Sequence, residues 1–135
     1  MVSIAGYARI SVDEELGADN PSIENQKAII SEYAAAHFPD ASLAFFEDRD
    51  RSGYTFEQRE GYQAMRAALR AGRFSIVIVK DFSRFSRRNS LGLYELEVLR
   101  DEGVRIISIG DGVDYPTRDD WLAIQFRFLM NEMPV

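Results

Sequence analysis

The sequence predicts an α/β fold with a mainly parallel central sheet of about four strands flanked by helices. Short strand-like runs alternate along the chain with segments of helical periodicity, which is the pattern of a parallel sheet. The run Ile76–Val79 is continuously apolar and β-branched, as is typical of a central strand covered on both faces. The 135 residues, 46% of them hydrophobic, are enough for a domain with a hydrophobic core. We expect residues 1–135 to form one domain, since no repeat, low-complexity tract or linker interrupts them.

The first predicted strand ends at Ser11. Its alternation places small or apolar side chains on one face and Tyr7, Arg9 and Ser11 on the other. Arg9 and Ser11 are two strand steps apart, about 7 Å, and point the same way. They lie at the carboxyl end of the strand, where open α/β sheets bind their ligands. An arginine beside a hydroxyl at this place indicates a phosphate site. The alternative is a surface cation next to a serine that only begins a loop.

Caps, breakers and periodicity predict the remaining elements in order. They are a polar loop over residues 12–20, a helix opened by Asn20 and Pro21 and running to about His37, a strand over 42–47, a charged loop over 48–55, a helix over 56–71, the strand over 76–79, a helix over 90–102, a strand over 104–109 and a turn over 110–112. On the helix over 90–102 we expect Leu91, Tyr94, Val98 and Leu99 to face the core.

A capping-box pattern over residues 117–120 opens a last helix that has two apolar stripes. One stripe holds Trp121, Ile124 and Phe128, and the other holds Leu122, Phe126, Leu129 and Met133. A surface helix of a monomer needs one apolar stripe, so two stripes predict contacts with both its own core and a partner. The alternative is a helix buried between the sheet and another element. We expect this helix to be truncated, because the chain stops at residues 134–135.

The charge is unevenly distributed. A net charge of −6 argues against a free-standing DNA-binding domain, because phosphate contacts dominate such binding. The segment over 80–88 is the exception, with four basic residues (Lys80, Arg84, Arg87 and Arg88) and one acid, Asp81. The planar fork of arginine suits phosphate, so we interpret this segment as a focused anion site. The alternative is a solvated face whose cations pair with Asp81 and other acids.

Some classes of protein are disfavoured by composition. The chain has no cysteine, which excludes a disulfide framework and a thiolate metal site. It begins with no leader-like segment and contains no apolar run of membrane-spanning length. We therefore expect a protein inside the cell that makes no membrane contact.

Five motifs occur in order along nearly the whole chain. They are residues 6–11 (GYARIS), 22–26 (SIENQ), 52–53 with 59–62 (SG and REGY), 79–87 (VKDFSRFSR) and 131–132 (NE). Together they resemble the serine recombinases, the resolvase and invertase group, and especially the catalytic domain of the large serine integrases. The resemblance implies a resolvase-like catalytic domain that acts on double-stranded DNA through a DNA-binding region missing from this chain. It also implies a cytoplasmic location, in a prokaryote or as a phage-encoded protein.

The resemblance implies a role for each site residue. Ser11 would be the nucleophile, forming a 5′-phosphoserine link to DNA and releasing a 3′ hydroxyl. Arg9, Arg84 and Arg87 would clamp the phosphate, with Arg59 assisting, and no metal or cofactor is expected. Further phosphate contacts are expected from Gln26, Lys80, Arg88 and Tyr7, with Asp81 as a possible acid. Homodimers and tetramers are expected to form through Trp121, Phe126, Leu129 and Met133.

Two points depart from a simple match. Many relatives place an acid directly before the first arginine of the cluster, where this chain has Ser83, which leaves the role of a carboxylate open. The lone histidine, His37, lies far along the first helix, so it does not explain how Ser11 loses its proton.

Two other classes of protein stay under consideration. One is a small phosphate-ester hydrolase or nucleotide-binding α/β domain, although the chain has no Gly-rich phosphate loop or carboxylate cluster. The other is a catalytically silent regulatory or interaction domain.

Overall fold

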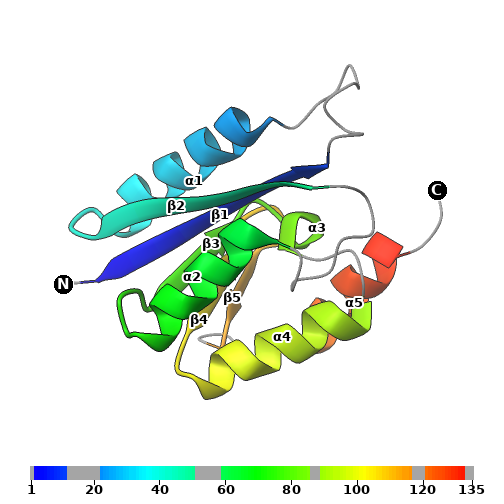
Figure 1. Ribbon diagram of the computed structural model, residues 1–135. Helices are drawn as coiled ribbons and strands as arrows, with labels where there is room; N and C mark the ends of the chain where they lie inside the picture. Colours follow the sequence, from blue (N-terminus) through cyan, green and yellow to red (C-terminus); the bar gives the residue numbers. More distant parts are fainter. Residues whose placement is uncertain (1, 12–21, 51–58, 86–88, 117–120, 133–135) are drawn as a thin grey trace.

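The computed structural model describes residues 2–11, 22–50, 59–85, 89–116 and 121–132, which form a five-stranded sheet with helices on both faces (Figure 1). The elements are β1 (Ser3–Ser11), α1 (Ile23–His37), β2 (Ser42–Asp50), α2 (Glu60–Arg70), β3 (Ile76–Val79), α3 (Phe82–Phe85), α4 (Asn89–Asp101), β4 (Arg105–Ser108), β5 (Val113–Tyr115) and α5 (Trp121–Glu132). The predicted α/β class with a mainly parallel sheet is confirmed.

The strands lie in the order β2-β1-β3-β4-β5. All neighbouring pairs are parallel except β4 and β5, which are antiparallel. From β1 the chain passes to β2 on one side and later returns to β3 on the other side of β1. The strand order therefore reverses between β1 and β3, and such switch points are where open α/β sheets bind ligands.

Two strands differ from the sequence prediction. The strand β2 continues to Asp50 instead of ending at residue 47, because its backbone stays paired with β1 as far as Ser11 despite its charged side chains. The strand β5 is absent from the prediction. Its three residues, with Asp114 at the centre, are too few to show a period, and its pairing with β4 makes it a strand.

The sheet separates two apolar layers. On one face, α1 contributes Ile30 and Ala34 to a cluster that includes Ile76 and Ile78 of β3. On the other face, a larger cluster includes Val77 and Val79 of β3 together with buried side chains of α2, α4 and α5. All four residues of β3 are buried, as predicted for a strand covered on both faces.

Two helices begin later than predicted. The cap of α1 is Ser22, whose hydroxyl accepts a hydrogen bond from the backbone N–H of Asn25 (3.0 Å), whereas we expected Asn20 and Pro21 to open this helix. Serine is as good a cap as asparagine, so residue type alone does not decide between Asn20 and Ser22. Asn20 and Pro21 themselves lie outside the described residues. The helix α2 begins at Glu60 and not at residue 56, because Arg59 has extended backbone angles (φ −95°, ψ 104°).

The buried face of α4 is also shifted from the prediction. Tyr94, expected in the core, is 65% exposed, whereas Leu96 and Leu99 are fully buried. The reason is Gly92, where an added Cβ would overlap the ring of Phe128 on α5. Gly92, Leu96 and Leu99 form the inner stripe at i, i+4 and i+7, and a glycine contributes nothing to a hydrophobic pattern. Of the other side chains expected inside, that of Val98 is half-buried and that of Leu91 lies outside the described part.

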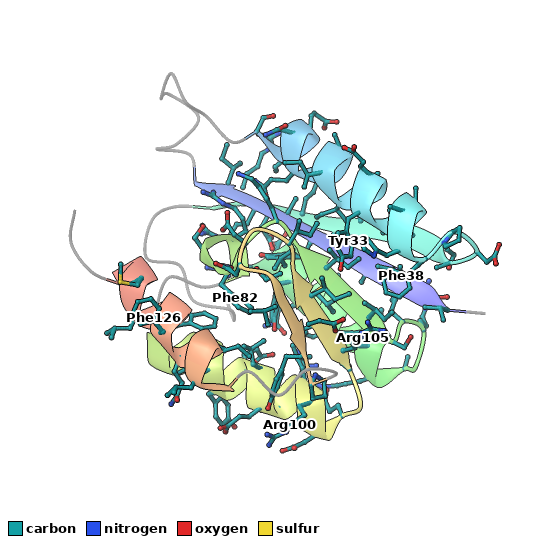
Figure 2. All side chains as sticks on the ribbon, turned by 180° about the vertical axis from the view of Figure 1, so that it is seen from behind. Tyr33, Phe38, Phe82, Arg100, Arg105 and Phe126 are labelled. Carbon is teal, nitrogen blue, oxygen red and sulfur yellow. The ribbon has the colours of Figure 1, made fainter. Side chains whose placement is uncertain are left out.

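The two predicted stripes of α5 face opposite ways. Ile124 and Phe128 are fully buried, while Leu122, Phe126 and Leu129 are 81%, 57% and 51% exposed. Phe126 lies on the side of α5 away from the sheet (Figure 2). The alternative of a helix covered on both sides is therefore wrong for the single chain. The side chain of Trp121 and the whole of Met133 fall outside the described part. No helix in the described ranges is long and apolar enough to cross a membrane.

Candidate active site

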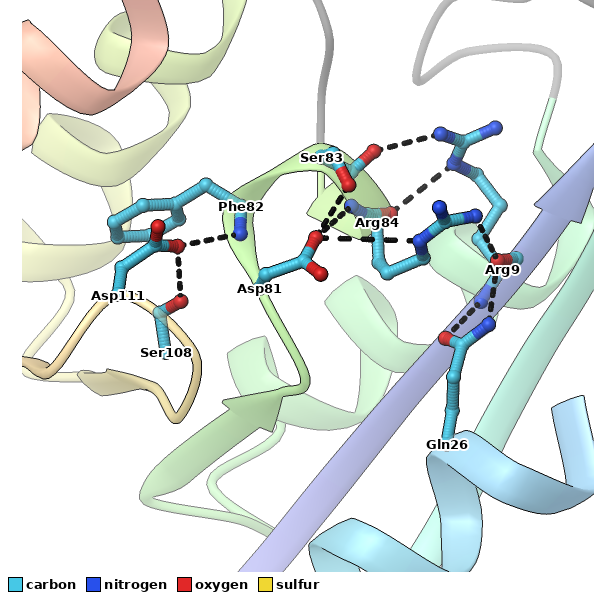
Figure 3. A network of polar contacts seen from close by, with 8 residues as sticks. All are labelled: Arg9, Gln26, Asp81, Phe82, Ser83, Arg84, Ser108 and Asp111. Atoms are coloured by element: carbon cyan, nitrogen blue, oxygen red, sulfur yellow. Dashed lines mark hydrogen bonds and ion pairs between the residues drawn. The ribbon is translucent and has the colours of Figure 1, made fainter. Parts of the chain in front are cut away.

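The carboxyl ends of β1 and β3 bring together the two arginines that the sequence singled out. The strand β1 ends with Arg9 and Ser11, and β3 is followed directly by Lys80, Asp81 and the short helix α3. Because β1 and β3 are hydrogen-bonded neighbours, α3 lies beside the last residues of β1 (Figure 3). The arrangement occupies the switch point of the sheet.

Arg9 and Arg84 interlock through each other's backbone. Arg9 donates from Nε to the carbonyl oxygen of Arg84 (3.1 Å) and from Nη2 to the carbonyl oxygen of Ser83 (2.7 Å). In return, Arg84 donates from Nη1 to the carbonyl oxygen of Arg9 (3.3 Å). The two residues are only 3% and 7% exposed. Each guanidinium group is thus held by the chain segment that carries the other, which fixes their relative position.

Asp81 caps the helix that carries Arg84. Its Oδ1 accepts hydrogen bonds from the hydroxyl of Ser83 and from the backbone N–H of Arg84 (3.3 Å), and it lies 4.0 Å from Arg84 Nε. A carboxylate that accepts from a backbone amide in the first turn is a typical helix cap. These contacts explain Asp81 as a structural support of α3, and they do not require it to exchange a proton.

Gln26 clamps the backbone of β1. Its side-chain oxygen accepts from the N–H of Arg9 (3.1 Å), and its side-chain amide donates to the carbonyl oxygen of Arg9 (2.9 Å). The residue is fully buried. We expected Gln26 to contact a phosphate; in the structure both ends of its amide bond the backbone of Arg9. These two bonds hold the end of β1 against α1.

Tyr7, which we expected to contact the phosphate, lies in the core. It is fully buried, and its hydroxyl donates to Oδ2 of Asp48 (2.8 Å). Burial raises the pKa of this hydroxyl well above its usual value, and the positive charges of Arg59 and Arg9 oppose the rise. The hydroxyl therefore lies within the electrostatic reach of two of the arginines assigned to the site.

Asp48 fixes the start of α2, where Arg59 is the cap residue. Besides the Tyr7 hydroxyl, its carboxylate accepts from the backbone N–H of Gly61 (2.8 Å) and from that of Tyr62 (2.8 Å). Arg59 itself is 5% exposed. The side chain of Asp48, on β2, thus supplies the hydrogen bonds that α2 lacks from its own cap.

The remaining site predictions have less structural support. Lys80 is half-buried, and its carbonyl oxygen accepts from the N–H of Gly110 (2.7 Å). Arg87, Arg88 and the side chain of Ser11 lie outside the described residues. Within the described ranges, no group of three or more histidine, cysteine, aspartate or glutamate side chains is placed to hold a metal ion.

The model of the resolvase N-terminal domain family matches residues 4–134. The chain belongs to the resolvase family. The resemblance noted in the sequence is thereby confirmed for almost its whole length. No curated protein sequence matches this resolvase-family domain.

Solved structures resemble the resolvase-family domain over most of its length. The N-terminal catalytic domain of TP901-1 integrase is 23% identical, with 96% of this chain and 94% of that chain covered and a TM-score of 0.76. A resolvase family site-specific recombinase from Streptococcus pneumoniae is 27% identical, with 98% and 87% covered and a TM-score of 0.72. The C-terminal catalytic domain of ISC1926 TnpA, an IS607-like serine recombinase, is 21% identical, with 80% and 70% covered and a TM-score of 0.65.

Two carboxylates of the resolvase-family domain were missed by sequence reasoning. Asp48 falls where the sequence predicts a charged loop, and Asp111 falls in the turn predicted over 110–112. Both accept backbone hydrogen bonds at the start of a helix that is distant in the chain. Their only signal in the sequence is an acid at the carboxyl end of a strand, which is too common to identify such a role.

Proposed function

We propose that this domain is the catalytic domain of a site-specific serine recombinase that cuts and rejoins double-stranded DNA. The observation that carries the proposal is the interlocked pair of Arg9 and Arg84 at the end of the strand that holds Ser11. Two fixed and largely buried cations repel one another, and this repulsion has an electrostatic cost that nearby negative charge lowers, as Asp81 does at 4.0 Å from Arg84 Nε. A phosphodiester offsets that cost and accepts the paired hydrogen bonds that guanidinium groups donate.

In the proposed reaction Ser11 Oγ attacks the phosphorus of a DNA phosphodiester. The bond from Oγ to phosphorus forms while the bond from phosphorus to the 3′ oxygen breaks. The net effect is that one proton passes from the serine hydroxyl to the 3′ oxygen, which becomes a hydroxyl, so the step neither takes up nor releases a proton. The resulting 5′-phosphoserine keeps the ester, so attack by a 3′ hydroxyl of another strand reseals the DNA without an energy source.

Arginines supply the charge stabilisation in this scheme. Phosphoryl transfer needs positioning and cations near the phosphate oxygens, and groups that are already fixed need no reorganisation during the reaction. Arg9 and Arg84 meet that requirement because backbone carbonyls hold both of them. We assign the same role to Arg87, with Arg59 assisting from the start of α2 and with Lys80 and Arg88 as further phosphate contacts.

The proton of Ser11 is not passed to histidine in this proposal. His37 stacks on Tyr33 (4.1 Å between ring centroids) at the last turn of α1. That turn is 11 residues beyond Gln26, which contacts the site, and a helix of that length spans about 16 Å. The positive charge of Arg9, two residues away on the same strand, favours the alkoxide form of Ser11 instead.

We also propose that copies of the chain assemble through α5, and that the domain reaches DNA with the help of a DNA-binding region. Four strand cuts require several active sites, which supports dimers and tetramers. The exposed apolar side chains of α5, Phe126 and Leu129 among them, support an interface there. We assign Trp121 and Met133 to the same assembly, although the side chain of Trp121 and the whole of Met133 lie outside the described part of the chain.

Covalent trapping tests the proposed chemistry. The chain is fused to a sequence-specific DNA-binding domain and mixed with duplex DNA that carries two of its sites around a nicked centre. The nick lets the cut end leave, so religation cannot hide the intermediate. We expect an adduct that survives denaturation, maps to Ser11 by mass spectrometry and forms without added metal or nucleotide.

Matched variants define the outcome. Ser11→Ala should form no adduct, whereas Ser42→Ala, whose hydroxyl contacts Ser3 at the other end of the sheet (3.0 Å), should react normally. Arg84→Lys keeps the charge but loses the planar fork, and we expect about 10²-fold slower adduct formation. An adduct that persists in Ser11→Ala contradicts the proposal. So does the absence of any adduct from a DNA-bound dimer and from a variant that is forced to form tetramers.

A further inference from the structure

The turn between β4 and β5 contacts the start of α3. In this turn Asp111 accepts two hydrogen bonds at Oδ2, one from the backbone N–H of Phe82 (2.9 Å) and one from the hydroxyl of Ser108 (2.6 Å) (Figure 3). Ser108 is fully buried at the end of β4. Ser108, on the same hairpin, therefore orients the carboxylate of Asp111 toward α3.

The helix α3 depends on such outside support. It has four residues, and so short a helix cannot form enough internal hydrogen bonds to be stable alone. Asp81, directly before α3, binds the amide of Arg84, while Asp111 binds the amide of Phe82 from the turn between β4 and β5. The hydrogen bond from Asp111 thus attaches α3 to the sheet, whereas the one from Asp81 joins residues that are close together in the chain.

The backbone on either side of this contact is also paired. The N–H of Ile109 donates to the carbonyl oxygen of Val79 (3.1 Å), and the N–H of Gly110 donates to that of Lys80 (2.7 Å). The ladder between β3 and β4 thus continues past the ends of both strands. Asp111 adds the next contact along this line, where the backbone of α3 turns away from the sheet.

The position of α3 in turn decides where the two arginines lie. The carbonyl oxygens that accept from Arg9 belong to Ser83 and Arg84, both in α3. Arg84 is carried by α3 itself and donates back to β1. A displacement of the start of α3 therefore moves the carbonyl oxygens that accept from Arg9. It moves the backbone that carries the side chain of Arg84 at the same time.

We propose that Asp111 is a positioning residue for the phosphate-binding arginines. It acts on Arg9 and Arg84 through the backbone of α3, and in this respect the inference rests on the proposed function. Asp111 holds the Phe82 amide so that the Ser83 and Arg84 carbonyls meet the guanidinium group of Arg9. Ser108 orients the carboxylate of Asp111, so it affects α3 only through Asp111.

The test follows the hydrogen bond of Arg9 directly. In the ¹⁵N-labelled chain of 135 residues, the Nε–H signal of Arg9, assigned with Arg9→Lys, reports its bond to the Arg84 carbonyl. Asp111→Ala should shift this signal and make its exchange with water at least about tenfold faster, because the acceptor moves. Asp111→Asn retains an oxygen acceptor and should restore both properties. Asp111→Ser, one bond shorter but still polar, provides a second loss variant if Asp111→Ala folds poorly.

Two controls separate positioning from general stability. Ser108→Ala leaves the Phe82 contact intact and should change the Arg9 signal less than Asp111→Ala does. Asp114→Ala breaks the ion pair between Asp114 and Arg105 (2.6 Å) on the same hairpin and should leave the Arg9 signal unchanged. Amide signals of Ile4 to Tyr7 in β1 should be unaffected in every variant.

Adduct formation provides the second readout, in the fusion described above. At saturating DNA, Asp111→Ala should slow the reaction about 10²-fold, since displacements of about 1 Å at reacting groups have effects of this size, while DNA occupancy stays the same. Asp111→Asn should recover most of the rate.

The outcomes are distinguishable. An unchanged Arg9 signal in both Asp111→Ala and Asp111→Ser overturns the inference. An Asp111→Asn variant as impaired as Asp111→Ala overturns it as well, because the acceptor is then not what matters. If neither the wild-type fusion nor the variant that is forced to form tetramers gives an adduct while the Arg9 signal responds as expected, the proposed function fails and the positioning of Arg9 by Asp111 stands.

Discussion

Replacing Asp48 by alanine should destabilise the domain more than any surface carboxylate would. Asp48 is 9% exposed, and its side chain accepts hydrogen bonds from the Tyr7 hydroxyl and from the amides of Gly61 and Tyr62. Without it the Tyr7 hydroxyl is left in an apolar interior, which costs about 1–3 kcal/mol. The loss of the α2 cap adds about 1–2 kcal/mol. The expected loss of unfolding free energy is therefore about 2–5 kcal/mol.

Urea unfolding monitored by circular dichroism measures this loss. Asp48→Asn retains one acceptor oxygen but places an NH₂ group against a group that donated to the carboxylate. We therefore expect a smaller loss of unfolding free energy, about 1–3 kcal/mol. Glu47→Ala is the matched control on the neighbouring residue. It removes an ion pair with Lys27 (2.6 Å) at the surface, which contributes at most about 1 kcal/mol. If Asp48→Ala loses no more stability than Glu47→Ala, the three hydrogen bonds do not hold α2 and the reasoning is refuted.

Three further predictions concern other parts of the molecule. Gly61→Ala should lower stability by more than about 2 kcal/mol in the same urea assay, because the added Cβ overlaps the carbonyl oxygen of Glu47; a neutral result would show that the start of α2 can move. Burial raises the pKa of both Tyr7 and Tyr62 above 10, so their contribution to stability is complete below pH 10 and is lost as pH rises from there toward the folded values. Urea midpoints should thus fall between pH 9 and pH 12, and less steeply in Tyr62→Phe; equal slopes would contradict the burial argument. Phe126→Glu should weaken self-association in analytical ultracentrifugation by at least about tenfold without lowering the melting temperature, and unchanged association would remove α5 from the interface.

Local sequence patterns correctly placed Arg9 and Arg84 at the carboxyl ends of two strands. Arg9 is placed by the alternation of β1, and Arg84 by its distance from the apolar run of β3. Each of the two strands is predicted from a pattern within ten residues. The rule that ligands bind at the carboxyl ends of parallel strands then indicates at which end of each strand the site lies. What local patterns could not supply is the partner of each side chain. Tyr7 and Gln26 were both expected at a phosphate, yet each makes its hydrogen bonds inside the protein.

Packing between helices was the weaker part of the prediction. The inner face of α4 was misplaced because Gly92 has no side chain to count, although it lies directly against Phe128. The strand β5 was missed because its existence depends on pairing with β4 and not on its own three residues. The inner face of α4 depends on a glycine, which adds nothing to a hydrophobic pattern, and on Phe128, which is distant in the chain. The strand β5 depends on its pairing with β4.

The sequence by itself determined the fold class, the strands β1 and β3, the two faces of α5 and, through its ordered motifs, the family. These depend on periodicity and on residue types close together in the chain. The tertiary structure alone decided that Arg9 and Arg84 hold each other and that two carboxylates, Asp48 of β2 and Asp111 of the β4–β5 turn, secure the starts of α2 and α3. Such contacts join residues 13 to 75 positions apart. The strand order brings them together, and strand order leaves no local trace in the sequence.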